Sequence, residues 1–307
     1  MTEYLIGIDG GGSHTEGVLC STAGEIVATV TAGPSSTAGT EFSEAMENLS
    51  QVILKLTEAM PQSARVACLY AGISGCGIKK DAEHYREVLR ERFPDISNMV
   101  IASDVFNPVF ATGMTENVIA AVCGTGSIAY AMTRDKVFRV DGYGYLLGDD
   151  AGGYAIGRQV LNSILRYADG RGEYTLLAEL FEKREGATIL ERATPISEGG
   201  KMVIASFAPL AFEAARAGDK VATAILDRVV EELCAIVCAA AKKIDVCPVP
   251  VVTGGSIWKA DNSRVLRAVQ EKLGDGYVWL SPTLPVTLGA VIRAASIAGV
   301  KGFQIKA

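Results

Sequence analysis

Two short segments rich in glycine and hydroxyl side chains carry the first chemical signal of this sequence. Residues 9–15 read Asp-Gly-Gly-Gly-Ser-His-Thr and follow the apolar run 4–8. Glycines allow a sharp turn whose amide N–H groups point inward, and such a turn binds phosphate oxygens without lysine or arginine. We therefore expect a nucleotide-phosphate site made by Gly10, Gly11, Gly12, Ser13 and Thr15.

The carboxylate at the start of this segment suggests a metal ion. Asp9 lies where it could hold Mg²⁺ through water, since Mg²⁺ keeps several waters when it is bound. A hairpin with a glycine-rich bend is the plain alternative, and the residues alone leave both open. A Walker loop is excluded because no G-x-x-x-x-G-K-[ST] occurs. The dinucleotide fingerprint fails because Thr15 occupies its third glycine position and a strand is expected next.

Similar segments recur further along the chain. One follows the apolar run 118–122 and is made of Gly124, Thr125, Gly126 and Ser127. Packed face to face across a cleft, this segment and residues 9–15 would clamp a polyphosphate from both sides. A third segment follows the run 249–252, where Gly254 and Gly255 would leave a flat surface for a purine.

Alternating strands and helices must position these segments. Runs 4–8, 17–20 and 26–31 surround the first segment in the same way that 118–122, 128–132 and 137–140 surround the second. This repeat predicts two related α/β halves, each led by three strands with helices covering mixed sheets. Further strands are expected at 66–71, 99–102, 249–252 and 277–280, and helices at 41–59, 80–93, 155–168, 173–182, 198–217, 219–243, 261–273 and 286–299.

Composition limits the function classes. The chain has 307 residues, 49% hydrophobic and 21% charged, enough for about two folded domains. A net charge of −6 without a basic block argues against nucleic acid as the partner. No stretch approaches a membrane span and no secretory signal is found, so we expect no membrane partner. Seven irregularly spaced cysteines without CxxC indicate reduced thiols in the cytoplasm.

Six segments resemble the N-acetylglucosamine kinase branch of the BadF/BadG/BcrA/BcrD ATPase family, within the actin-like superfamily of sugar kinases. They occur in the family's order and cover nearly the whole length, the GDDAGG block being the most specific. They are IGIDGGGSHTEGVL (6–19), AGISGCG (71–77), IASDVFNPV (101–109), AAVCGTGSIAYA (120–131), GYGYLLGDDAGGYAIGRQVL (142–161) and VTGGSIW (252–258).

The resemblance implies two ribonuclease-H-like domains with a nucleotide and sugar cleft between them. We expect the first domain at 1–115, with the C-terminal helix in 286–307 packing back on it, and the second at 116–285. ATP and Mg²⁺ would bind in the cleft, and the γ-phosphate would pass to a hydroxyl of an amino sugar. N-acetylglucosamine is the first substrate expected, with N-acetylmuramic acid or glucosamine next, and a homodimer is an open option.

The resemblance also assigns residue roles. Asp104 would be the catalytic base that accepts the proton of the sugar hydroxyl, whereas without the resemblance an N-cap of a helix near Asn107 is favoured. The identity of the sugar stays open because Tyr143, Asp150 and the segment 35–37 depart from the family pattern. The full expected sugar-binding set is Ser36, Ser74, Asp104, Thr125, Gly142, Tyr143, Gly144 and Asp149.

Two other functions share this fold. One is an ATPase activator of a radical dehydratase or reductase, whose iron–sulfur cluster needs paired cysteines across a dimer. Cys123 precedes the second glycine segment, but no well-placed partner cysteine follows it. The other is a non-catalytic sugar sensor, against which the retained Asp9 and Asp104 argue.

Overall fold

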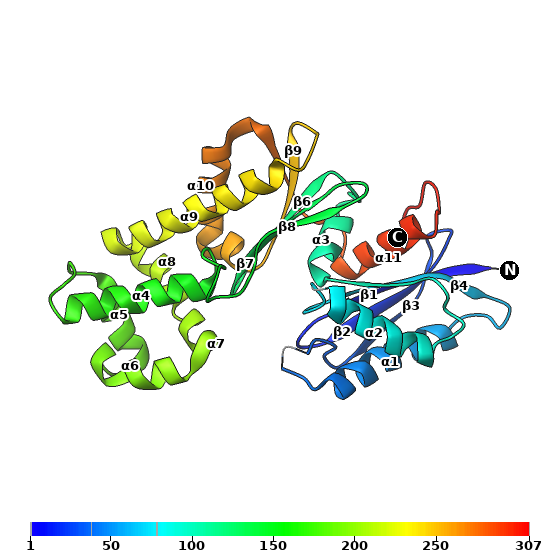
Figure 1. The fold of residues 1–307 in the computed structure, drawn as a ribbon, viewed down its shortest axis with the longest axis horizontal. Helices are drawn as coiled ribbons and strands as arrows, with labels where there is room; N and C mark the ends of the chain where they lie inside the picture. Colours follow the sequence, from blue (N-terminus) through cyan, green and yellow to red (C-terminus); the bar gives the residue numbers. More distant parts are fainter. Residues whose placement is uncertain (1, 38, 78, 307) are drawn as a thin grey trace. The chain divides into compact units, whose positions relative to one another are not determined.

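The structure is a computed structural model that describes residues 2–37, 39–77 and 79–306. The chain divides into two compact units (Figure 1). The first contains residues up to Glu116 together with those from Leu280 onward, and the second contains Asn117–Trp279. We describe each unit by itself.

The first unit is a five-stranded mixed sheet in the order β3-β2-β1-β4-β5. β1 to β3 form an antiparallel meander, and β4 and β5 continue the sheet parallel to β1. Its elements are β1 (Glu3–Gly10), β2 (Thr15–Ser21), β3 (Ile26–Ala32), α1 (Phe42–Glu58), β4 (Arg65–Ile73), α2 (Lys79–Arg92), β5 (Met99–Ala102), the 3₁₀ helix η1 (Asp104–Phe106), α3 (Asn107–Phe110) and α11 (Val286–Ile297).

Alternation along β1 gives this sheet two covered faces. Ile6 and Ile8 are buried in the core beneath α1 and α2. The residues between them point to the other face, where α11 packs on β1. A Cβ built on Gly7 would lie 2.3 Å from the backbone nitrogen of Val291, so α11 can approach this closely only over a glycine. Asp9 follows in the same alternation and lies on the α11 side of the sheet.

The second unit repeats this plan. Its sheet has the order β10-β9-β6-β7-β8, with an antiparallel β6–β8 meander and β9 parallel to β6. Its elements are β6 (Val118–Cys123), β7 (Ser127–Met132), β8 (Val137–Asp141), α4 (Gly153–Ala168), α5 (Leu176–Glu185), α6 (Ile189–Glu198), α7 (Gly200–Ala205), α8 (Ala208–Arg216), α9 (Lys220–Ala241), β9 (Val249–Gly254), η2 (Ile257–Lys259), α10 (Ala260–Leu273), η3 (Gly274–Gly276) and β10 (Tyr277–Leu280). The two sheets confirm the predicted α/β class with two similar halves.

The expected single helix at 198–217 is wrong. The end of α6 reaches Glu198, and the rest of the stretch forms the two separate helices α7 and α8. Gly200 has φ +72°, a left-handed conformation that interrupts helical winding between α6 and α7. Pro209 lies in the first turn of α8, a position where its missing N–H costs nothing. The helix expected at 173–182 begins later, since the Thr175 hydroxyl accepts a hydrogen bond from the N–H of Leu177 and so caps α5.

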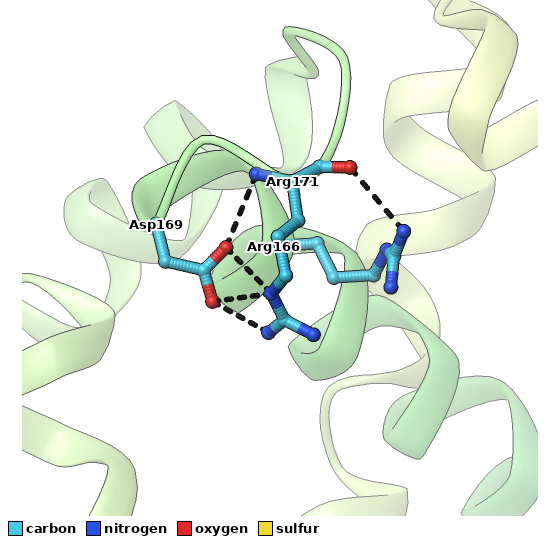
Figure 2. Close-up of polar contacts among 3 residues, drawn as sticks. All are labelled: Arg166, Asp169 and Arg171. Atoms are coloured by element: carbon cyan, nitrogen blue, oxygen red, sulfur yellow. Dashed lines mark hydrogen bonds and ion pairs between the residues drawn. The ribbon is translucent and has the colours of Figure 1, made fainter.

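An exposed group of charges closes the C-terminal end of α4 (Figure 2). The Asp169 carboxylate accepts hydrogen bonds from the backbone N–H of Arg171 at 3.2 Å and from its Nε at 2.9 Å. Arg166 donates to the carbonyl oxygen of Arg171 at 3.2 Å. The Arg171 guanidinium holds the pKa of Asp169 below its ordinary value. Exposed pairs of this kind add little stability, so we give this group no role beyond ending the helix.

Among the described residues, none of the helices combines the length and the apolar character that crossing a membrane requires.

The contact between Gly7 and α11 yields a stability prediction. Replacing Gly7 with Ala places a methyl group against the Val291 backbone, and overpacking of this kind costs about 1–3 kcal/mol. Urea unfolding should therefore show a lower free energy of unfolding for Gly7→Ala. Gly276→Ala is the matched control, because a Cβ there has open space around it. Equal stability of the two variants would contradict the close packing of α11 on β1.

Candidate active site

The carboxyl ends of three parallel strands bring Asp9 and Asp104 together in the first unit. Asp9 is the penultimate residue of β1, and Asp104 follows β5 after a single residue. Asp9 pairs in register with Gly72 of β4, and Gly72 pairs with Ala102 of β5. The strand between the two carboxylates therefore presents no side chain at this level. Crevices at the carboxyl ends of parallel strands are where α/β proteins usually bind ligands.

Burial and mutual repulsion define the charge state of this pair. Burial raises the pKa of Asp9, and a hydrogen bond from Asn107 at 2.5 Å opposes that effect. Burial also raises the pKa of Asp104, and the negative charge of Asp9 adds to the rise. A pair of carboxylates whose pKa values are both raised, one of them partly by the charge of the other, is a site at which a bound proton or cation is favoured.

Asp104 is not the helix cap that the residues alone favoured. Ser103 takes that position, because its Oγ accepts a hydrogen bond from the N–H of Val105 at 3.4 Å. Asp104 lies within the first turn of η1 and is half-buried. Ser103 is thus the N-cap of η1, and its hydroxyl also donates to Asp104 Oδ1 at 3.3 Å.

The first glycine segment is tied to two other loops by its carbonyl groups. The carbonyl oxygen of Gly10 accepts a hydrogen bond from the N–H of Ser74 at 2.8 Å. The carbonyl oxygen of Gly11 accepts from the N–H groups of Ser35 and Ser36 at 3.1 and 3.2 Å. The expected phosphate residues Gly10 and Gly11 therefore lie beside the expected sugar residues Ser36 and Ser74.

The donors of this segment are only partly available. The N–H of Gly11 donates within the turn to the carbonyl of His14 at 2.9 Å. The Thr15 side chain is fully buried, and its hydroxyl donates to the carbonyl of Gly33 at 2.9 Å. This hydroxyl holds the hairpin to the end of β3, and the expected contact of Thr15 with phosphate stays a prediction. Gly12 and Ser13 are exposed at the tip of the turn.

The second glycine segment packs on the beginning of α4. The N–H groups of Gly153 and Tyr154 donate to the carbonyls of Gly124 and Thr125 at 2.7 and 3.0 Å. A Cβ on Gly126 would fall 2.4 Å from the Asp149 carboxylate. Because these glycines have no side chains, the loop at residues 124–126 lies close to both the Asp149 carboxylate and the first residues of α4.

The third glycine segment lies against the second. A Cβ on Gly255 would lie 2.3 Å from the carbonyl oxygen of Cys123 and 3.0 Å from the nitrogen of Gly124. Gly255 also has φ +95°, which favours glycine. Gly254 instead faces the Val122 side chain. Gly255 therefore borders the second segment, whereas Gly254 continues β9.

A cavity of about 350 Å³ opens beside these two segments, within the second unit. Gly124, Thr125 and Gly153 form its glycine-rich end, and Arg216 and Asp261 form an ion pair at 3.3 Å on its lining. The remaining lining is small or apolar and consists of Ala205, Ser206, Ala208, Pro209, Phe212, Ser256, Ile257 and Ala260. The lining includes the neighbouring Ser256 and Ile257 but not Gly254 or Gly255, and the purine surface expected at the two glycines stays a prediction.

Asp149 is held rigidly in the second unit. It is buried, has φ +61°, and forms an ion pair with Lys201 at 3.6 Å. Its N–H donates to the Asp141 carboxylate at 3.1 Å. The neighbouring expected residues differ in exposure: Gly142 packs on Ile128, whereas Tyr143 is 63% exposed. Gly144, with φ +90°, has open space at its Cβ position.

The predicted residues thus form two groups, one in each unit. Asp9, Asp104, Gly10–Ser13, Thr15, Ser36 and Ser74 lie in the first unit, and the other predicted residues lie in the second. Sequence analysis missed three polar residues. Asn107 touches Asp9, Arg216 lines the cavity, and Lys201 pairs with Asp149. Asn107 alone had a signal, because it lies within the segment 101–109 that resembles the family.

The repeated sheet plan and the glycine turns define the class of protein. The structure has the two-unit architecture of actin-like ATPases and sugar kinases. The chain belongs to the BadF/BadG/BcrA/BcrD ATPase family, whose sequence profile matches residues 6–294.

Curated relatives carry kinase names. The chain is 30% identical to an N-acetyl-D-glucosamine kinase of Dictyostelium discoideum, over 95% of this chain and 98% of that protein. It is 28% identical to an N-acetylmuramic acid/N-acetylglucosamine kinase of Clostridium acetobutylicum, over 57% and 58% of the two chains.

Among solved structures, one from Chromobacterium violaceum, described as a candidate N-acetylglucosamine kinase, has a TM-score of 0.68 at 24% identity. It covers 94% of this chain and 98% of that chain. A ROK family glucokinase from Streptomyces griseus has a TM-score of 0.53 at 17% identity, covering 95% and 98% of the chains. These likenesses confirm the fold.

The raised pKa of Asp104 yields a second prediction. A carboxyl group whose pKa is higher in the folded than in the unfolded chain favours folding at acid pH, and this contribution is lost as pH rises through the folded pKa. Asp104→Asn should therefore unfold at a higher urea concentration than the parent near neutral pH, in metal-free buffer. The difference should shrink as pH falls toward the ordinary value of 3.8.

Asp95→Asn is the matched control, since Asp95 is exposed in the same unit. An Asp104→Asn variant that is less stable than the parent near neutral pH would contradict the burial of this charge.

Proposed function

We propose that this protein is an ATP-dependent kinase that transfers the γ-phosphate of ATP to a hydroxyl of an amino sugar. The pairing of Asp104 with Asp9 at the carboxyl ends of β5 and β1 carries the proposal. Phosphoryl transfer needs aligned reactants, a group that receives the hydroxyl proton and neutralised phosphate charge. Family membership supports the use of ATP, and the names of the curated relatives support the amino sugar.

Asp104 is the proposed base. Its carboxylate would accept the proton of the sugar hydroxyl as the oxygen of that hydroxyl bonds to the γ-phosphorus. The bond from that phosphorus to the β,γ-bridging oxygen would break, and ADP would leave with that oxygen. A carboxylate whose pKa is raised by burial and by Asp9 holds that proton better than an ordinary aspartate does. Because Asp104 must be ionised to act, kcat should fall with decreasing pH around a value above the ordinary one.

The residues at the carboxyl ends of β1 and β5 fit Mg²⁺, and we include this ion in the proposal. Asp9 is an oxygen donor whose charged form is disfavoured by burial and whose negative charge also disfavours that of Asp104, so a divalent cation held by Asp9 would relieve both effects. Asp9 would hold the ion through water, and the ion would neutralise phosphate charge. Among the described residues, no group of three or more histidine, cysteine, aspartate or glutamate side chains gathers as a metal site, so water and phosphate would complete the coordination.

The nucleoside of ATP is assigned to the cavity of the second unit. Its apolar walls suit a purine, and Ser206, Ser256 and Arg216 supply polar groups for the ribose and the first phosphates. Thr125 and Gly124 at one end of the cavity would meet the phosphates. The expectation that the two glycine segments face one another concerns the placement of the units and stays a prediction.

The proposed sugar is N-acetylglucosamine first, with N-acetylmuramic acid or glucosamine as the other candidates. Asp149 would accept hydrogen bonds from sugar hydroxyls, because Lys201 and the backbone hold its carboxylate in place. Gly142, Tyr143 and Gly144 border the same loop, and Ser36 and Ser74 would contribute from the first unit. A panel of amino sugars in an ATP-consumption assay tests this assignment.

Nothing in the structure favours the ATPase activator. Cys123, the cysteine beside the second glycine segment, is buried and its thiol donates to the carbonyl of Ala151 at 3.2 Å. Burial raises the pKa of this thiol, which opposes the thiolate that an iron–sulfur cluster needs. All seven cysteines are free thiols, which supports a cytoplasmic location as part of the proposal. The homodimer stays a prediction.

Replacement of the base gives the third prediction. Asp104→Asn should lower kcat by about 10²–10⁴-fold, because proton transfer to the carboxylate is lost while the side chain keeps its shape. Calorimetric titration should show sugar affinity close to that of the parent. Asp95→Asn should keep full activity. Turnover that survives in Asp104→Asn would remove Asp104 as the base, and a parent without ATP-dependent turnover on any sugar would favour the sensor.

Filling the cavity gives the fourth prediction. Ser256 lines the cavity from an exposed position, so Ser256→Trp should occupy the purine space without disturbing the core. The KM for ATP should rise by about tenfold or more, equivalent to ~1.4 kcal/mol, while the KM for sugar should stay within about twofold. Ser63→Trp, at an exposed loop of the first unit, is the control. An unchanged KM for ATP would move the nucleoside out of this cavity.

A further inference from the structure

Asn107 is the buried polar residue of the first unit that the proposed reaction does not yet use. It begins α3, one turn after Asp104, and is completely buried. Its Nδ2 donates to Asp9 Oδ1 at 2.5 Å and to the carbonyl oxygen of Ile8 at 3.4 Å. Both hydrogen bonds reach β1 from a segment that follows β5, so the side chain crosses the strand between them.

Gly72 makes this crossing possible. It is the β4 residue paired with Asp9, and a Cβ there would lie 2.3 Å from Oδ1 and 2.5 Å from Nδ2 of Asn107. Any other residue at position 72 would push the amide away from Asp9. The position does not require glycine for its backbone, because Gly72 is not among the residues with positive φ. Its lack of a side chain therefore serves the amide of Asn107.

The amide of Asn107 is held at a cost. Its Oδ1 is buried and has no hydrogen-bond partner among the residues that the structure describes. A buried oxygen without a partner is destabilising, and leucine would fill the same space without that cost. The opposite orientation of the amide would place its oxygen against the Asp9 carboxylate. The residue is thus suited to one task, which is to donate to Asp9.

We propose that Asn107 is a positioning residue that fixes the Asp9 carboxylate for a divalent cation, with Gly72 as the residue that gives it access. The inference rests on the proposed role of Asp9 in holding Mg²⁺. By donating to Oδ1, the amide fixes the rotamer of Asp9, and Oδ2 would then meet the water shell of the ion. Partners that orient a metal ligand in this way typically change metal affinity by about 10–100-fold.

The same segment couples the two carboxylates. Asp104 lies in η1 and Asn107 begins the helix that follows it, so a shift of the segment 103–107 moves both the base and the support of Asp9. A Cβ on Gly289 of α11 would lie 2.1 Å from the carbonyl oxygen of Asn107, which shows how tightly α11 confines this segment. The position of this short segment therefore affects both the proposed base, Asp104, and the support of the proposed cation residue, Asp9.

The test measures metal binding directly. Electron paramagnetic resonance detects free Mn²⁺, so the loss of that signal on adding protein gives the affinity of the protein for Mn²⁺ without any turnover. The titration is done with saturating ADP, and the Mn²⁺ bound by ADP alone is subtracted. Asn107→Leu and Gly72→Ala should each weaken Mn²⁺ binding by about 10–100-fold, since one removes the donor and the other displaces it. Asn107→Leu should melt close to the parent temperature, because it removes the unpartnered oxygen together with the hydrogen bonds.

Matched controls separate this role from packing. Asn98→Leu removes one amide hydrogen bond, to the carbonyl of Ala67, elsewhere in the same unit, and Gly276→Ala adds a methyl group in open space. Both should bind Mn²⁺ like the parent, whereas Asp9→Asn should lose it. If Gly72→Ala does not fold, Asn107→Leu carries the test.

Two results would overturn the inference. If Asn107→Leu binds Mn²⁺ as tightly as the parent and Asp9→Asn does not, Asn107 has no positioning role, although Asp9 still holds the metal. If Asp9→Asn binds Mn²⁺ like the parent, neither the metal role of Asp9 nor the positioning role of Asn107 stands. Kinase activity is scored separately on the parent: a parent that phosphorylates no amino sugar, with the Mn²⁺ effects intact, overturns the proposed function and leaves the role of Asn107 standing.

Discussion

The repulsion between two half-buried carboxylates is the constraint on which the first unit is built. Burial makes both Asp9 and Asp104 harder to ionise, and the negative charge of Asp9 makes Asp104 harder still to ionise. The parallel strands β1, β4 and β5 hold them at one edge, and Asn107 bonds one of them in place. Stability is given up locally in return for a site that attracts a cation or a proton, which is common where proteins bind ligands or do chemistry.

Glycine does the complementary work in both units. At Gly72 it admits an amide, at Gly126 it admits the Asp149 carboxylate, and at Gly255 it lets β9 end against the loop that follows β6. In each case the neighbour is polar and close, so a methyl group would displace a functional group and not merely crowd the core. At these three positions the glycine lets polar atoms approach the backbone closely.

Local patterns were sufficient to predict the sheets, because each strand is a short apolar run that ends at a turn signal. They failed at the ends of helices and at contacts between segments distant in sequence. The helix expected at 198–217 is divided between α7 and α8 after Ala205, and Gly200, whose left-handed conformation the apolar periodicity did not reveal, separates α7 from α6. Ser103 and not Asp104 caps η1, although both residues can cap. Asn107 meets Asp9 and Lys201 meets Asp149 only because folding brings separate elements together. Local propensity holds no information about either pair.

The discontinuity of the first unit has a consequence for how the protein is made. The second unit is one continuous stretch, whereas the first needs α11, which lies near the end of the chain. A ribosome therefore releases β1 to β5 long before the helix that covers their α11 side exists, and the intervening unit can fold in the meantime. Since α11 also confines the segment that carries Asp104 and Asn107, the carboxylate pair is among the last features to assemble. A nascent chain that stalls before Leu280 would contain Asp9, Asp104 and Asn107 but would lack α11, which confines the segment that carries two of them.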